Sequence, residues 1–151
     1  MKVSVDTEIN SPKDKVWDVI TDFENSPNVI SGIIGLQVLE KPASGLVGFK
    51  WKETRKMFGK EAEETMWITD CEEGQYYATR AENHGAIYRS MLFVEAMDAH
   101  NTKLTMSFEG DSDSMFVKII SAVMGLFMKK SMTKMLQDDL DDIKLYVEAG
   151  S

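Results

Sequence analysis

Apolar and polar residues alternate at the start of the chain. Val3, Val5 and Ile9 lie on one side of an extended segment, and the residues between them are otherwise polar. A period of two is typical of a strand with one buried face. The pattern therefore predicts a first strand over residues 3–9.

Two short helical segments are expected after this strand. Ser11 is predicted to be an N-cap, with Pro12 as the first helical residue and Asp14 as a carboxylate three residues after the cap. Val16 and Ile20 continue the segment at helical spacing. The first helix is therefore expected to begin at Pro12.

Short strands separated by turns account for the middle of the chain. Ser26-Pro27 begins a second short helix or a turn, and residues 33–40 then become strand-like. A turn follows at Ser44-Gly45, and loops at residues 83–85 and 98–101 are expected to close later hairpins. The pattern predicts a run of antiparallel strands.

One hairpin has a predictable register. A two-residue turn at Phe58-Gly59 would place Trp51 opposite Met66 and Glu53 opposite Glu64. In this register the apolar residues of both strands share one face, which supports it. The same face continues on the later strands with Tyr88, Ser90, Leu92, Val94, Leu104, Met106 and Phe108. The concave face of the sheet is therefore expected to be mostly apolar and aromatic.

A long helix is predicted at the end of the chain. It is expected to begin with Ser112 or Ser114 as its cap and to run to about Glu148, a length of about 50 Å at 1.5 Å per residue. Its first half is apolar on nearly all sides, so we expect it to be covered on more than one side. Its second half carries an apolar stripe formed by Met132, Met135, Leu136, Leu140, Ile143 and Val147. The charged side of that half is expected to face water.

Composition narrows the class of protein. The 151 residues show no break in composition and are expected to form one domain over residues 1–151. Hydrophobic residues make up 43% and charged residues 28%, as in ordinary globular proteins. A net charge of −8 would repel the phosphates of nucleic acids and of anionic lipids. No nucleic-acid partner is therefore expected.

The sequence also bears on compartment. A single cysteine, Cys71, excludes an intramolecular disulfide, and the N-terminus lacks the apolar run of a signal peptide. The longest apolar stretch, residues 115–128, is interrupted by Lys118 and is too short to span a bilayer. We therefore expect a cytoplasmic protein without integral membrane association.

Motifs for metal or nucleotide chemistry are weak. His84 and His100 fall in predicted turns far apart in the sequence, and no acidic cluster shows ligand spacing around either. Residues 32–35 lack the rest of a nucleotide-binding motif. No metal and no cofactor is expected. Cys71 has no recognisable base beside it and is given no catalytic role.

Two segments carry a resemblance to a known family. The opening strand followed by Ile9-Asn10-Ser11-Pro12-Lys13-Asp14-Lys15-Val16-Trp17-Asp18-Val19-Ile20-Thr21-Asp22 resembles the start of polyketide cyclase/dehydrase-like proteins of the SRPBCC superfamily. That superfamily also includes START lipid-transfer domains and the birch-pollen allergen group. The central hairpin of the family is matched by Gly48 with Trp51-Lys52-Glu53-Thr54-Arg55, and by Phe58-Gly59-Lys60-Glu61-Ala62 with Glu64. The resemblance covers essentially the whole chain.

The resemblance implies an α+β helix-grip fold. In this fold a curved antiparallel sheet of about six or seven strands, with two short helices after the first strand, wraps around a long C-terminal helix. It also implies a cavity between sheet and helix that binds a hydrophobic or amphipathic molecule such as a lipid, a quinone or a polyketide. We expect the ligand-binding residues to be Phe49, Trp51, Glu53, Arg55, Glu64, Met66, Ile68, Tyr88, Ser90, Leu92, Met106, Phe108, Ile120, Met124 and Phe127.

The polar residues of this set have two interpretations. Glu53, Arg55, Glu64 and Tyr88 could orient the polar end of a ligand in an otherwise apolar pocket. Alternatively, Glu53, Arg55 and Glu64 lie near the hairpin tip, where Arg55 balances two carboxylates and water reaches all three. The residues alone leave both interpretations open.

Three functions follow from these patterns. The first is a non-catalytic carrier of an apolar small molecule. The second is a cyclase or dehydratase in which Glu53, Glu64 or Tyr88 transfers a proton. The third is a protein-interaction or co-chaperone-like module that uses the exposed side of the last helix, with a homodimer as one form. The sequence favours the first.

Overall fold

The main layer of the fold is one curved antiparallel sheet. The computed structural model describes residues 1–57, 59–83, 85–112 and 121–150. Within them, seven strands lie in the order β1-β7-β6-β5-β4-β3-β2. They are β1 (Lys2–Ile9), β2 (Ile33–Glu40), β3 (Lys50–Met57), β4 (Lys60–Glu72), β5 (Tyr76–Asn83), β6 (Ala86–Ala96) and β7 (Thr102–Ser112). The predicted run of antiparallel strands is confirmed.

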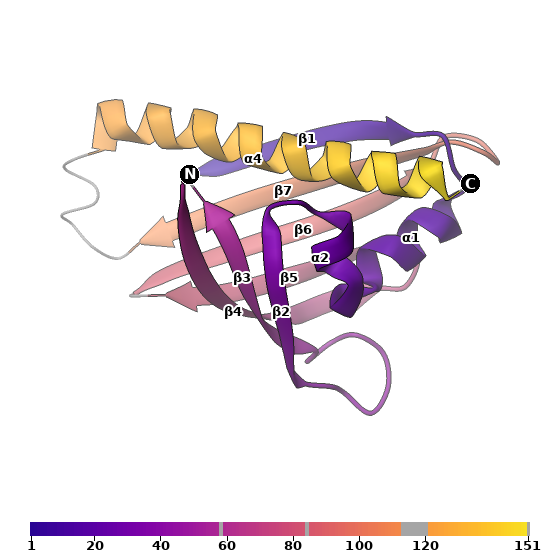
Figure 1. Cartoon of the computed structure of the whole chain (residues 1–151), viewed down its shortest axis with the longest axis horizontal. Coiled ribbons are helices and arrows are strands. Elements are labelled where there is room, and N and C mark those ends of the chain that lie inside the picture. Colours follow the sequence, from indigo (N-terminus) through magenta and orange to yellow (C-terminus); the bar gives the residue numbers. More distant parts are fainter. Residues whose placement is uncertain (58, 84, 113–120, 151) are drawn as a thin grey trace.

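Helices cover the concave side of this sheet. α1 (Lys13–Thr21), the 3-10 turn η1 (Phe23–Asn25) and α2 (Ser26–Val29) connect β1 to β2, and α4 (Ser121–Ala149) ends the chain. Figure 1 shows α4 lying along β1, with α1 and α2 below its C-terminal half. This is the helix-grip arrangement, and the predicted fold class is confirmed.

The predicted registers agree with the observed pairing. Trp51 pairs with Met66 and Glu53 with Glu64 across β3 and β4, as a two-residue turn requires. The β5–β6 and β6–β7 hairpins close at the predicted loops. Residues two apart on a strand share a face, so these registers place Trp51, Met66, Tyr88, Leu92, Met106 and Phe108 on one side of the sheet.

One predicted helix start is wrong, and one of the two alternatives for another is excluded. Pro12 rather than Ser11 is the N-cap of α1, and its side chain makes no capping bond. The Ser11 hydroxyl has no hydrogen-bond partner among the described residues, whereas its carbonyl accepts a hydrogen bond from Thr102 Oγ1 at 2.8 Å. Ser112 ends β7, where it pairs with Ala86, and so it does not cap the last helix. Ser114 lies outside the described residues.

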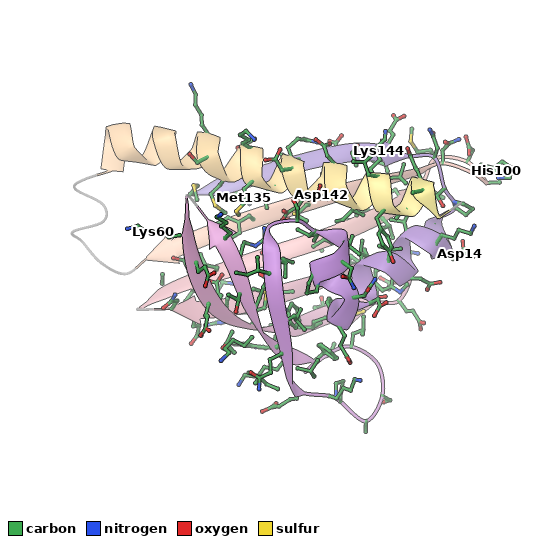
Figure 2. All side chains as sticks on the ribbon, in the orientation of Figure 1. Asp14, Lys60, His100, Met135, Asp142 and Lys144 are labelled. Carbon is green, nitrogen blue, oxygen red and sulfur yellow. The ribbon has the colours of Figure 1, made fainter. Side chains whose placement is uncertain are left out.

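The second half of α4 is fixed to the sheet in two ways. Its apolar stripe is buried, as predicted, with Leu140 and Ile143 almost fully enclosed. Hydrogen bonds hold its polar sides: Asp142 Oδ2 accepts from the backbone and hydroxyl of Ser31 at 3.0 and 2.8 Å, and Lys144 Nζ donates to the Glu8 carbonyl at 2.8 Å. Figure 2 shows Asp142 near the start of β2 and Lys144 near the end of β1.

A cluster of aromatic rings joins η1 to the sheet. The Phe23 ring stacks on Trp51 with centroids 4.7 Å apart and lies 5.0 Å from Phe49. Tyr77 meets the same ring edge-on at 5.3 Å. All four residues are at least nine-tenths buried, so this cluster anchors the α1–α2 connection against β3 and β5.

Candidate functional site

A cavity of about 250 Å³ lies between the concave face of the sheet, α4 and the α1–α2 connection. Its walls are mostly apolar. Figure 2 shows Met135 projecting from α4 toward the sheet, and this residue lines the cavity together with Leu92 and Met106 from the opposite wall. Charged side chains enter the wall from β3, β4 and α4 only, among the described residues.

Most of the predicted ligand-binding residues line this cavity. Those that do are Trp51, Glu53, Arg55, Glu64, Met66, Tyr88, Ser90, Leu92, Met106 and Phe108. Phe49 and Ile68 instead pack in the hydrophobic core. Ile120 lies outside the described residues, as do the side chains of Met124 and Phe127.

Sequence reasoning missed one wall and one charged residue. The α1–α2 connection contributes Ile20, Phe23 and Ile30, although the chain pattern there indicated only short helices. Asp139 of α4 also lines the cavity and is 5% exposed. A signal for it existed, because Asp139 lies three residues after Leu136 and four before Ile143 and so interrupts the apolar stripe.

Arg55 and Asp139 form a buried ion pair between β3 and α4. Arg55 Nη1 donates to both carboxylate oxygens of Asp139 at 3.0 Å each. The side chains are 14% and 7% exposed. Gly32 makes room for the guanidinium, because a Cβ at that position would lie 3.3 Å from Nη1. The pair therefore links the sheet to the helix at the cavity wall.

Glu53 and Glu64 flank the same guanidinium. Arg55 Nε lies 3.6 Å from Glu53 Oε2, and Glu53 is 12% exposed. Glu64 faces Glu53 across the hairpin and is half-buried. The interpretation in which water reaches all three groups at the hairpin tip is therefore wrong, because the side chains of Arg55 and Glu53 are largely enclosed.

Burial sets the protonation behaviour of this group. It raises the pKa of Glu53, of Glu64 and of Asp139, and the positive charge of Arg55 only partly offsets this. Burial alone would lower the pKa of Arg55, but Asp139 and Glu53 outweigh it and raise that pKa. One guanidinium thus faces three carboxyl groups that resist ionisation.

Tyr88 lies beside Glu64 on the cavity wall. Its ring stacks on Phe108 with centroids 5.7 Å apart. Burial and the nearby Glu64 raise the pKa of its phenol. Gly110 permits this packing, since a Cβ there would lie 3.2 Å from the Tyr88 ring. Tyr88 therefore presents a neutral phenol to the cavity at neutral pH.

Other reactive groups are placed away from the cavity or are absent from the described part. Burial, followed by the charges of Glu73 and Asp70, raises the pKa of the Cys71 thiol, which disfavours a nucleophilic thiolate. His100 lies at the tip of the β6–β7 hairpin in Figure 2, and His84 is outside the described residues. The described residues contain no metal-ligand cluster of His, Cys, Asp and Glu, and none of their helices is long and apolar enough to cross a membrane.

Many solved structures share this fold, and three of them illustrate the likeness. A START superfamily protein from Mycobacterium smegmatis matches with a TM-score of 0.82 at 15% identity, covering 99% of each chain. A protein from Thermus thermophilus matches with a TM-score of 0.83 at 12% identity, covering 100% of this chain and 99% of the other. An aromatase/cyclase, Zhui, from Streptomyces sp. R1128 matches with a TM-score of 0.81 at 13% identity, covering 98% and 93%. At such identities the likeness shows the fold alone.

The sequence itself matches one family model over nearly its whole length. No curated protein matches it. The model describes polyketide cyclases, dehydrases and lipid transport proteins, and it matches residues 1–148. Together with the helix-grip sheet and its cavity, this match shows that the chain belongs to the polyketide cyclase/dehydrase and lipid transport family.

Proposed function

We propose that this chain is a non-catalytic carrier that holds a small hydrophobic or amphipathic molecule in the cavity between sheet and α4. The observation that supports the proposal is the cavity itself, with apolar walls and one cluster of charged groups. Ligand sites are typically concave and apolar, with a few placed polar groups that fix orientation. The apolar walls supply affinity and the cluster orients the polar end of the ligand.

The volume indicates a small ligand. About 250 Å³ lies just below the range of roughly 300–1,000 Å³ that is typical of small-molecule sites. A one- or two-ring compound or a short acyl chain suits this space better than a lipid with two long chains. Its binding would come from apolar area removed from water, at about 25 cal/mol per Å² before the costs of association.

Native mass spectrometry on protein purified without added ligand tests the proposal. We expect a stoichiometric mass increment, which denaturing extraction would then release as a small apolar compound. A clean apo protein that also fails to take up any apolar probe would contradict a carrier function.

A cavity-filling variant locates the binding. Met106 is 7% exposed and lines the cavity, so Met106→Trp should abolish ligand uptake by occupying the space. Met97→Trp makes the same change at a side chain that is 51% exposed and should bind normally. Ser90→Leu, a second filling change on the cavity wall, serves if Met106→Trp does not fold. Normal ligand uptake by both filled variants would show that the ligand binds outside this cavity.

The state of Glu64 favours a second candidate, a cyclase or dehydratase. Its carboxyl lines the cavity beside Tyr88, and burial raises its pKa, as a general acid requires. A short linear poly-β-ketone thioester is a suitable probe, with formation of an aromatic product followed by absorbance. If the chain is an enzyme, Glu64→Gln should still bind the probe but lose turnover. If it is a carrier, neither the parent chain nor Glu64→Gln should convert the probe.

A further inference from the structure

The charges on the cavity wall are unbalanced. Among the described lining residues, Arg55 is the only cationic side chain, and it faces the carboxyl groups of Glu53, Glu64 and Asp139. Met1 also borders the cavity, but its ammonium group is exposed and donates to the Gly110 carbonyl at 3.1 Å. The wall therefore holds more carboxyl groups than cations, and the carboxyl groups that Arg55 does not balance are either negatively charged or protonated.

Arg55 is already engaged. Its Nη1 donates to both oxygens of Asp139, and its Nε faces Glu53 at 3.6 Å. A carboxylate or phosphate on a ligand would compete with two protein carboxylates for this guanidinium. The same ligand charge would also lie close to Glu64, which repels it in a partly desolvated site.

Glu64 is a polar group of the wall without a partner among the described residues. It makes no hydrogen bond or ion pair with any of them, and it lines the cavity. Burying a polar group without a partner is costly, so a bound molecule that satisfies Glu64 gains affinity. Glu64 accepts hydrogen bonds when ionised.

We propose that the cavity selects ligands whose polar end donates hydrogen bonds, as a hydroxyl or an amine does, and rejects ligands that end in a carboxylate or a phosphate. The inference rests on the proposed function, because it names the chemistry of the molecule carried. The donor group of the ligand meets Glu64. The apolar body fills the remainder of the cavity.

Three probes with one ring system test the charge preference. They are 1-naphthalenemethanol (neutral donor), 1-naphthylmethylamine (cationic donor) and 1-naphthoate (anion), each titrated at pH 7 by calorimetry. The indole resonance of Trp51 in NMR spectra reports binding in the cavity. We expect the alcohol and the amine to bind at least about tenfold more tightly than the carboxylate, which corresponds to roughly 1.4 kcal/mol. Equal or tighter binding of naphthoate would overturn the inference while leaving the carrier function intact.

A pair of variants assigns the preference to Glu64. Glu64→Gln removes the unpaired carboxyl at nearly constant volume and should reduce the affinity ratio of amine to carboxylate at least about fivefold, or ~1 kcal/mol. Glu61→Gln makes the same change in net charge at an exposed position of β4 and should leave the ratio unchanged. An unchanged ratio in Glu64→Gln would overturn the assignment. Failure of all three probes to bind, together with no co-purified molecule, would overturn both the inference and the carrier function.

Discussion

Replacing Asp139 by asparagine tests the buried ion pair that joins α4 to the sheet. The change keeps the shape of the side chain and removes its charge, so that Arg55 loses its closest ionic partner. Arg55 and Asp139 are 14% and 7% exposed, so water can replace little of the lost interaction. Breaking a pair of this kind by removing one partner typically costs about 3–5 kcal/mol.

Two features of the site reduce that cost. The amide oxygen of the new side chain would still accept one hydrogen bond from Arg55 Nη1, and Glu53 remains 3.6 Å from Nε. We therefore expect Asp139→Asn to lower the free energy of unfolding by about 2–3 kcal/mol, or the melting temperature by roughly 4–12 °C for a chain of this size.

The neighbouring residue supplies a matched control. Asp138 is on the exposed side of the same helix, where it pairs with Lys134 at 2.8 Å. Exposed pairs four residues apart contribute only about 0.3–0.5 kcal/mol, so Asp138→Asn should cost no more than that. Urea unfolding of the parent chain and the two variants, compared at equal slopes, gives both values. If the two variants unfold at the same urea concentration, the buried pair does not hold the helix as described.

Three further predictions concern the site and its support. Burial raises the pKa of Glu64 above its ordinary 4.5, so the folded state keeps the proton to a higher pH than the unfolded state does. The free energy of unfolding should therefore fall as the pH rises from about 4.5 through the raised pKa. In thermal melts across that pH range, Glu64→Gln should flatten the slope of stability against pH, and Glu61→Gln should not. Phe23→Ala should cost about 3–5 kcal/mol in urea unfolding, because Phe23 stacks on Trp51 at 4.7 Å and packs against Tyr77, and a cost below about 1 kcal/mol would contradict its anchoring role. Gly110→Ala should cost about 1–3 kcal/mol and shift the near-UV signal of Tyr88, because the new Cβ would lie 3.2 Å from its ring; an unchanged spectrum would show that the ring has room to move.

The sheet is predictable because local rules determine it. The two-residue turn that the sequence predicts between Met57 and Lys60 sets the β3–β4 register, and a period of two then assigns each residue to a face. Trp51 and Met66 can therefore be assigned to the concave face from the sequence, and they line the cavity in the structure. The register argument works where turns are short, since few alternative pairings remain.

The missed features depend on contacts between distant segments. Asp139 was missed because charged residues surround it in the sequence of α4. Only the position of Arg55 on β3 shows that Asp139 is a buried charge on the apolar stripe, where it forms an ion pair. The capping signal at Ser11 is misleading because the Ser11 carbonyl is held by Thr102 of β7. Likewise, the wall formed by η1 depends on how Phe23 stacks against β3, which local spacing does not specify.

The ion pair between β3 and α4 can serve the stability of the fold or the selection of the ligand. Replacing buried ion pairs or triads by apolar residues of similar volume is often neutral or stabilising, whereas removing Arg55 with Asp139 alone would leave the carboxyl of Glu53 buried without its cation. The triple variant Glu53→Met, Arg55→Met and Asp139→Leu should therefore recover most of the stability that Asp139→Asn loses. It should also remove the charged wall beside Glu64 and alter which ligands bind. If stability recovers while ligand selection is lost, the buried ion pair serves to select the ligand. If both stability and selection are lost, the ion pair is needed for the fold.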